Sequence, residues 1–357
     1  MEYKRLGDYI REVNVRNREL KVTNLLGMSI SKKFIPSIAN TIGTDMATYK
    51  IIKLNQFAYV PVTSRNGEKI TIALLDCDDE AIISQAYTVF EIIDKEQLLS
   101  EYLMMWFRRP EFDRYARFHS HGSAREIFDW DELCDVMLPI PSITRQREIV
   151  AEYETLTRRI RLNNQMIQHL EATAQAIYRK TFIDNIDKEN LPEGWRMGTL
   201  GNLAEIKNGK AIVPSGGDIP VYGGNGIIGY TSRSNAEDVV VIGRVGINCG
   251  SLYLHQSKCY VNDNAMIAIP KNGNTIFLYR TMKEMDLNGQ SEGSGQPLLT
   301  QSIIYKQECL IPKLEQRIKF EEQMRIVYKL KSLKEADNAK LTELQSLLLA
   351  KMGNLKQ

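Results

Sequence analysis

Two similar stretches decide the fold of this chain: residues 138–147 are LPIPSITRQR and residues 310–317 are LIPKLEQR. Each contains Ile-Pro, a short spacer and Gln-Arg. After each stretch the chain runs on without glycine or proline, from Ser142 to Leu191 and from Lys313 to Met352. Because these residues cost about 1 and 3 kcal/mol inside a helix, we expect a long uninterrupted helix in both places.

Apolar residues in both expected helices recur at alternating steps of four and three, which is the spacing of a coiled-coil seam. The first seam is Ile149, Tyr153, Leu156, Ile160, Asn163, Ile167, Leu170, Ala174 and Ile177. The second, looser seam is Phe320, Met324, Val327, Leu330, Leu333, Asp337, Leu341, Leu344, Leu348 and Met352. The polar members Asn163 and Asp337 either fix the register of the helix pair or face solvent in an imperfect heptad, and both interpretations stay open.

The part of the chain outside the expected helices has the composition of a globular protein. The whole chain has 357 residues, which is enough for about two domains. Seventeen of the 23 glycines lie between Gly194 and Gly295, among short β-type runs such as VVVI at 239–242, which indicates a loop-rich β or α+β domain. No apolar run approaches the roughly 20 residues that span a bilayer. The five cysteines form no C-x-x-C pair and the N-terminus resembles no export signal, so we expect a cytoplasmic protein with reduced thiols and no membrane contact.

The chain also repeats itself. The pairs Gly122-Ser123 and Gly293-Ser294 each begin 19 residues before the Pro of the following Ile-Pro, and Tyr3–Tyr9 is similar to Met197–Leu203. We therefore predict four segments, two globular and two helical: 1–141, 142–183, 184–312 and 313–357. The order globule, helix, globule, helix predicts an α+β protein in which an antiparallel coiled coil holds two similar globules apart. A pseudo-two-fold internal repeat of this kind suits two half-sites on duplex DNA.

Several motifs are distributed along nearly the whole chain. In the second half they are LPEGW at 191–195, GDIPVYGGNG at 217–226 and VIGRVG at 241–246, and in the first half ISQAY at 83–87 with Tyr59 and Phe90. Together they resemble the specificity (S) subunits of type I restriction-modification systems. The resemblance implies that 1–141 and 184–312 are target-recognition domains, each recognising one part of a split sequence in double-stranded DNA. It also implies that the helices join the domains and recruit two adenine-N6 methyltransferase subunits.

The same resemblance implies a non-catalytic chain with no cofactor of its own. S-adenosylmethionine, ATP and Mg are expected on partner subunits only. Whether a restriction and translocase subunit also binds is left open. The chain is short for this family, which leaves open a related system with a separate specificity chain.

Two motifs that imitate catalytic sites are interpreted as structural or DNA-facing. Residues 224–229, GNGIIG, match the dinucleotide fingerprint G-x-G-x-x-G, but β-forming residues and a turn follow instead of the required helix, so we expect a hairpin turn. His119 and His121 have no nearby third ligand in the sequence, so we predict no metal site and expect them to join a DNA-facing patch. The sequence contains no Walker-type phosphate loop and no adenine-methyltransferase motif.

Candidate DNA contacts are basic and amide side chains in turns and in one arginine-rich segment. Five arginines lie within residues 108–125 and form either a phosphate-binding patch or the solvated face of an amphipathic helix; we favour DNA contact. The first-half candidates are Lys32, Lys33, Arg65, Asn66, Lys69, Arg114, Arg117, His119 and Arg125. The second-half candidates are Lys207, Lys210, Asn225, Tyr230, Arg233, Arg244, Asn248, Asn262 and Asn264, several of which we expect to hold turns instead.

Candidate subunit contacts lie on the helices and their entry segments. They are Gln146, Ile149, Leu156, Ile160, Gln316, Phe320, Leu341 and Leu344. The competing hypotheses are a two-headed scaffold that binds protein instead of DNA and, more remotely, a nucleotide-dependent enzyme. The net charge of +2 averages over globules and helices and does not exclude local basic surfaces.

Overall fold

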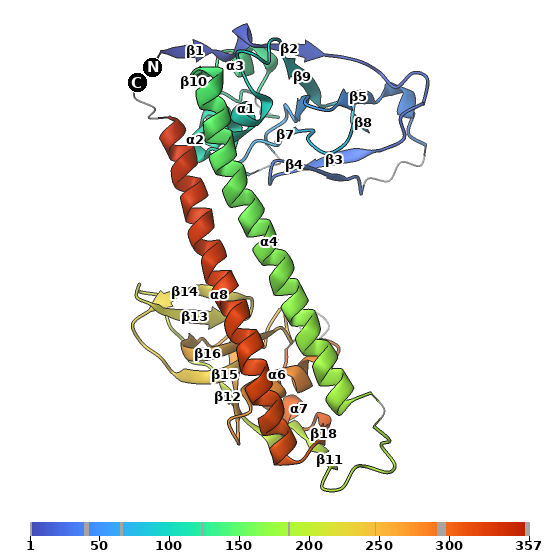
Figure 1. Cartoon of the computed structure of the whole chain (residues 1–357), viewed down its shortest axis with the longest axis vertical. Helices are drawn as coiled ribbons and strands as arrows, with labels where there is room; N and C mark the ends of the chain where they lie inside the picture. Colours follow the sequence, from blue (N-terminus) through green and yellow to red (C-terminus); the bar gives the residue numbers. More distant parts are fainter. Residues whose placement is uncertain are drawn as a thin grey trace. The chain divides into compact units, whose positions relative to one another are not determined.

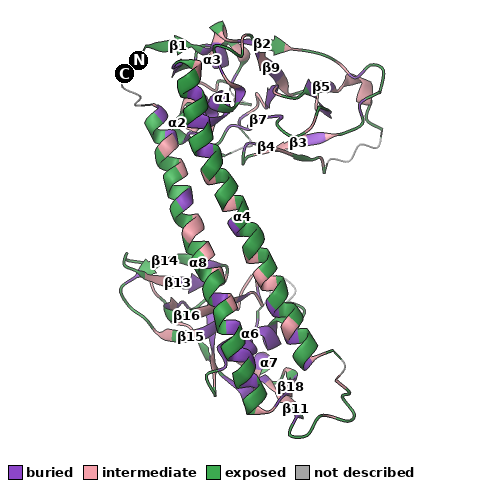
Figure 2. Cartoon of the chain, viewed as in Figure 1, coloured by how far each residue is buried: buried purple, intermediate pink, exposed green. Residues whose placement is uncertain are grey.

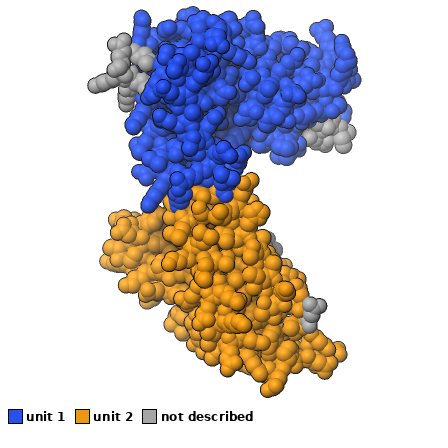
Figure 3. All heavy atoms as spheres, in the orientation of Figure 1, with its two compact units in different colours: residues 1–162, 337–357 blue, residues 163–336 orange. Residues whose placement is uncertain are grey.

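The computed structural model (Figure 1) describes residues 2–38, 43–64, 67–122, 125–184, 186–246, 248–290 and 298–353. Buried side chains form separate hydrophobic cores in the two halves (Figure 2). The chain accordingly divides into two compact units (Figure 3), unit 1 with residues 1–162 and 337–357 and unit 2 with residues 163–336. Each long helix therefore contributes one end to each unit.

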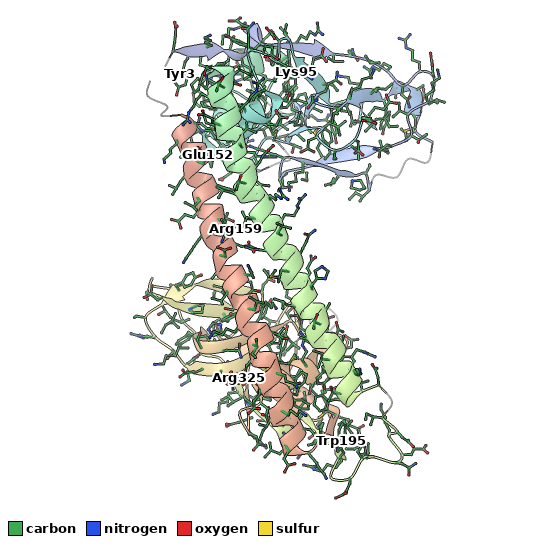
Figure 4. All side chains as sticks on the ribbon, viewed as in Figure 1. Tyr3, Lys95, Glu152, Arg159, Trp195 and Arg325 are labelled. Atoms are coloured by element: carbon green, nitrogen blue, oxygen red, sulfur yellow. The ribbon has the colours of Figure 1, made fainter. Side chains whose placement is uncertain are left out.

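The two long helices are α4 (Ile143–Phe182) and α8 (Leu314–Met352), which confirms the prediction from the stretches without glycine and proline. In unit 1, Gln345 Nε2 donates to Thr157 Oγ1 at 2.7 Å, and Arg159 (labelled in Figure 4) forms an ion pair with Asp337 at 3.1 Å. In unit 2, Lys331 lies 2.9 Å from Glu171, and the ring centroids of Tyr178 and Phe320 are 5.8 Å apart. Increasing numbers on α4 meet decreasing numbers on α8, so the helices run antiparallel within each unit.

The described residues of unit 1 form several small sheets and three short α-helices in addition to the ends of α4 and α8. Its elements are β1 (Tyr3–Arg5), η1 (Leu6–Asp8), β2 (Ile10–Val13), β3 (Leu26–Ser29), β4 (Lys33–Pro36), η2 (Met46–Thr48), β5 (Lys50–Lys53), β6 (Phe57–Tyr59), β7 (Ile72–Leu74), β8 (Glu80–Ile83), β9 (Thr88–Ile92), α1 (Ser100–Phe107), α2 (Pro110–Phe118), α3 (Trp130–Cys134) and β10 (Met137–Pro139). Strands β2, β9, β6 and β7 form one antiparallel sheet in that order.

Unit 2 is built around a larger sheet. Its elements are β11 (Arg196–Thr199), α5 (Leu200–Leu203), β12 (Ala204–Asn208), β13 (Ile219–Gly223), β14 (Gly226–Thr231), β15 (Ala236–Gly243), β16 (Leu252–Val261), β17 (Ala265–Pro270), α6 (Thr275–Lys283), α7 (Gln301–Tyr305) and β18 (Glu308–Ile311). The six-stranded sheet has the order β12-β17-β15-β16-β13-β14. The chain is thus α+β, as predicted.

The internal structure of the two units confirms the sequence repeat. Strand β1 pairs with β10 so that Tyr3 faces Pro139, and β11 pairs with β18 so that Met197 faces Leu310. These partners occupy equivalent places in the two copies. The sheet order β2-β9-β6-β7 of unit 1 recurs as β12-β17-β15-β16 in unit 2. The two units therefore repeat the same strand pairing and register as well as similar sequence.

The helix entries correct the alignment of the repeat by one residue. Gln146 is fully buried, and its Nε2 donates to the carbonyl of Pro141 at 2.9 Å, five residues back. In unit 2, Arg317 makes the equivalent hydrogen bond: its Nε donates to the carbonyl of Pro312, five residues back, at 3.1 Å. Gln146 therefore corresponds to Arg317 and not to the exposed Gln316.

Several predicted subunit contacts are corrected by burial. Gln146, Ile149, Phe320 and Leu341 are at most 5% exposed, so their side chains have no surface left for a partner. Leu156 and Ile160 are half-buried, while Leu344 is 50% exposed.

The second predicted seam is also wrong in part, because Leu333 is 58% exposed and Leu330 is 39% exposed. A straight helix drifts by about 20° per heptad from a 3.5-residue repeat, so an imperfect heptad loses its seam over a long helix. Among the residues described, no helix is both long and apolar enough to span a membrane.

Candidate nucleic-acid interface

Tight backbone packing joins the end of β12 to the β16–β17 turn in unit 2. After β12, the Gly209 amide donates to the carbonyl of Ala265 and the Lys210 amide to that of Val261, both at 3.0 Å. A Cβ atom at position 209 would lie only 1.9 Å from the carbonyl oxygen of Asn262, so this close approach requires glycine. The exposed Lys210 side chain is thereby placed beside the β16–β17 turn.

Two further segments meet this turn. The Arg244 amide, directly after β15, donates to the carbonyl of Asn264 at 3.1 Å. A Cβ atom at Gly243 would lie 2.5 Å from the carbonyl oxygen of Gly224, which belongs to the β13–β14 turn. We call residues 209–210, 223–226, 243–246, 248 and 262–264 the glycine end of unit 2.

The structure confirms that GNGIIG forms a hairpin turn. Gly223 pairs with Gly226, so Gly224 and Asn225 form the two-residue connection between β13 and β14. Gly226 has a φ of +90°, a backbone conformation that favours glycine. Because a strand and not a helix follows, the segment presents no helix N-terminus to a pyrophosphate.

The glycine end gathers five of the predicted contacts in addition to Lys210 and gives them different roles. Asn225 and Asn264 are exposed, while Arg244 and Asn248 are half-buried. The Nε of Arg244 is buried without a hydrogen-bond partner among the described residues, so it keeps an unused donor. Asn262 is a correction, because it is 6% exposed and its Oδ1 accepts from the Asn264 amide at 2.9 Å, which uses the side chain to hold the turn.

Three predicted contacts of unit 2 lie outside the glycine end. Lys207 on β12 is exposed and lies 3.1 Å from Glu205. Tyr230 is 50% exposed near the opposite end of the β13–β14 hairpin, and the exposed Arg233 follows that strand. These three residues stay predictions, as do the exposed residues of the glycine end.

Lys32 in unit 1 anchors a hairpin and is a second correction. It lies between β3 and β4 with a φ of +61°. Its side chain is 6% exposed, and its ammonium group lies 2.7 Å from the carboxylate of Asp113 and donates to the carbonyl of Phe107. Burial lowers its pKa, which the hydrogen bond to Asp113 only partly offsets. A DNA phosphate therefore cannot reach Lys32, whereas the neighbouring Lys33 is exposed.

Helix α2 and the segments beside it carry most of the other first-half candidates. Arg114 is exposed and lies 3.3 Å from Glu111, and the exposed Arg117 forms an ion pair with Glu126. Lys69 lines a small hollow with Arg117, Glu68 and Asp113. Exposed pairs of this kind contribute about 0–1 kcal/mol, so phosphates can replace the acidic partners. We call Lys69, Arg114, Arg117 and the exposed Arg125 the basic patch of unit 1.

The remaining first-half candidates are less informative. His119 Nδ1 lies 2.8 Å from Glu132, and His121 Nε2 lies 3.5 Å from the same carboxylate. No group of three or more side chains able to hold a metal occurs in the described ranges. Arg65 and Asn66 lie outside the described residues.

Comparisons with known proteins show which proteins this chain is similar to. Residues 192–347 match the family described as the type I restriction modification DNA specificity domain. The chain is 29% identical over 143 residues to the type I restriction enzyme EcoprrI specificity subunit of Escherichia coli, an alignment covering 37% of this chain and 35% of that protein. It is 27% identical over 131 residues to the MjaIX specificity subunit of Methanocaldococcus jannaschii, covering 33% and 30%. The aligned parts thus span about a third of these relatives.

A solved structure has a similar fold. The S subunit of a type I restriction-modification system from M. genitalium superposes with a TM-score of 0.65 at 15% identity, covering 99% of this chain and 96% of that one. At this identity the likeness concerns the fold alone. The sequence matches agree with the resemblance drawn from the sequence motifs: this chain is similar to the specificity subunits of type I restriction-modification systems.

One exposed side chain was missed from the sequence. Phe118, the last residue of α2, is 80% exposed beside the basic patch of unit 1. Phe118 follows Arg114 by four residues, which places both on the same face of the helix. This spacing could have identified Phe118 from the sequence as a neighbour of the predicted contacts.

Proposed function

We propose that this chain is the DNA-recognition subunit of a type I restriction-modification complex. Unit 1 and unit 2 each recognise one part of a split sequence in double-stranded DNA, and the chain itself is not catalytic. The duplicated strand register carries this proposal, since two copies of one unit provide two recognition surfaces for two half-sites. The domain match over residues 192–347 supports the same assignment.

The proposal includes partners that bring the chemistry. Two adenine-N6 methyltransferase subunits bind the long helices and carry S-adenosylmethionine. Any restriction and translocase subunit carries ATP and Mg. Helix α8 keeps exposed apolar side chains for such contacts, with Ile326 at 75% and Leu344 at 50% exposure.

Sequencing of methylated bases in cells with and without the gene tests the proposal. We expect adenine methylation at one split motif to disappear with the gene. Retention of every methylated motif would contradict the proposal.

A second experiment tests the two-part recognition. Residues 1–141 are replaced by the corresponding half of another family member, with residues 142–357 unchanged as the internal control. We expect one part of the split motif to change and the other to stay. A change in both parts would refute independent recognition by the two units.

Salt dependence separates DNA recognition from a protein-binding scaffold. DNA affinity that depends on phosphate contacts falls steeply between 50 and 200 mM salt, because binding releases condensed counterions. If the chain binds a partner with an affinity that is insensitive to salt in this range, and binds no duplex, the result would favour the scaffold.

A further inference from the structure

Phe118 presents an aromatic ring to solvent from a helix whose other face is fully packed. The ring is 80% exposed, whereas Phe112 and Ala116 on the same helix are 3% and 0% exposed. Burial of a Phe side chain removes apolar surface from water and stabilises a fold. The fold leaves this stabilisation unused at position 118.

Side-chain contacts of the residues around Phe118 hold the C-terminal end of α2 in place. The His119 ring stacks on Tyr115 with centroids 4.2 Å apart and is tied to Glu132 at 2.8 Å. Ser120 Oγ donates to the carbonyl of Ala116 at 2.6 Å. The edge of the Phe118 ring meets His119, with centroids 5.2 Å apart and an interplanar angle of 75°. The exposed ring is therefore mounted on an anchored segment.

The surroundings of the ring are cationic and displaceable. Arg114 lies one helical turn before Phe118 on the same face, and Arg117 precedes it directly. The carboxylate partners of these arginines, Glu111 and Glu126, are 48% and 36% exposed. Exposed ion pairs are weak, so both guanidinium groups are available to an anionic ligand that also offers an apolar surface.

Duplex DNA has both properties. Apolar side chains of DNA-binding proteins insert between base steps and unstack them, while neighbouring cations hold the phosphates. We propose that Phe118 stacks against a base step of duplex DNA while Arg114 and Arg117 bind the flanking phosphates. This inference rests on the proposed function and adds to it a residue and a mode of contact.

A tryptophan at this position reports the contact directly. In the variant Phe118→Trp the new indole is exposed, whereas the native Trp106 and Trp195 are 7% and 9% exposed and Trp130 is half-buried. The full chain is assembled with its methyltransferase subunits and titrated with a duplex that carries the split motif found by methylation sequencing. We expect the emission of the new indole to be quenched by the duplex and not by the methyltransferase subunits.

Ile93→Trp is the matched control, because Ile93 is 53% exposed and lies outside α2; we expect no quenching there. Phe118→Ala is expected to weaken duplex binding about 5- to 150-fold, since base–aromatic stacking is worth roughly 1–3 kcal/mol, with an unchanged Tm. Quenching by the methyltransferase subunits alone would mean that protein covers the ring, and absence of quenching in a complex that binds the duplex would mean that bases do not touch it. Either result overturns the stacking proposal alone. If the wild-type complex binds no duplex, the proposed function fails as well.

Discussion

A buried arginine in unit 2 depends on one carboxylate. Arg280 on α6 is 3% exposed, and its Nη2 lies 2.9 Å from the carboxylate of Glu171 on α4 and 3.3 Å from the Glu171 carbonyl. The guanidinium carbon lies 5.5 Å from the ring centroids of both Tyr279 and Tyr328. Lys331 on α8 approaches the same carboxylate at 2.9 Å. Glu171 therefore joins three helices of unit 2.

The variant Glu171→Gln removes the charge and keeps the shape. Removing one partner of a fully buried ion pair costs about 3–5 kcal/mol. Glu171 is 32% exposed and its backbone carbonyl still accepts from Arg280, so we reduce the expected cost to about 2 kcal/mol. For a unit of this size, that loss lowers the Tm by roughly 4–8 °C.

Scanning calorimetry of the full chain measures this effect at several pH values. Burial raises the pKa of Glu171, but the hydrogen bond from Lys331 and the charge of Arg280 outweigh it and hold the pKa below its usual value. The stabilisation is therefore complete above the unfolded pKa of about 4.3 and is lost as the pH falls through the folded pKa. The difference between wild type and Glu171→Gln should accordingly shrink as the pH falls below 4.

The matched control is Glu322→Gln, since Glu322 is exposed on α8 in the same unit. We expect its Tm to stay within about 2 °C of wild type, because surface substitutions change stability by at most about 0.5 kcal/mol. Equal Tm changes in the two variants at neutral pH would refute the reasoning. So would a Glu171→Gln effect that does not shrink in acid.

Three further substitutions test the structural assignments by urea unfolding and DNA binding. Gly209→Ala places a Cβ atom 1.9 Å from a carbonyl oxygen and should lower the free energy of unfolding by more than about 2 kcal/mol. In the control Gly27→Ala the new Cβ atom meets nothing closer than 3.9 Å, so the loss should be under about 1 kcal/mol. Equal losses would contradict the close approach at Gly209. Lys32→Met removes the buried ammonium and should destabilise unit 1 by about 3 kcal/mol. Its control Lys33→Met should leave stability unchanged and lower the salt dependence of DNA binding. The reverse pattern would restore Lys32 as a DNA contact. Gln146→Leu strands buried backbone groups and should cost about 1–3 kcal/mol, and a neutral result would show that these hydrogen bonds are dispensable.

The secondary structure of the long helices and the repeat followed from local sequence. Helices α4 and α8 begin shortly after Pro141 and Pro312, and neither contains glycine or proline; α8 ends directly before Gly353, whereas α4 ends at Phe182, before Pro192 is reached. The GNGIIG segment is a hairpin turn because β-forming residues follow it. Helix propensity and turn chemistry act over a few residues, so a single sequence carries this information.

The recognition surfaces depended on contacts between residues far apart in the chain. The burial of Lys32 required Asp113, and the position of Lys210 at the glycine end required the turn around Asn262. The exposure of Phe118 required that the packed face of α2 be occupied by other residues. The sequence shows the type of each side chain and, from the spacing, on which face of a helix it lies. Only tertiary packing decides whether that face meets the core, an ion-pair partner or solvent, because burial depends on every segment that folds against it.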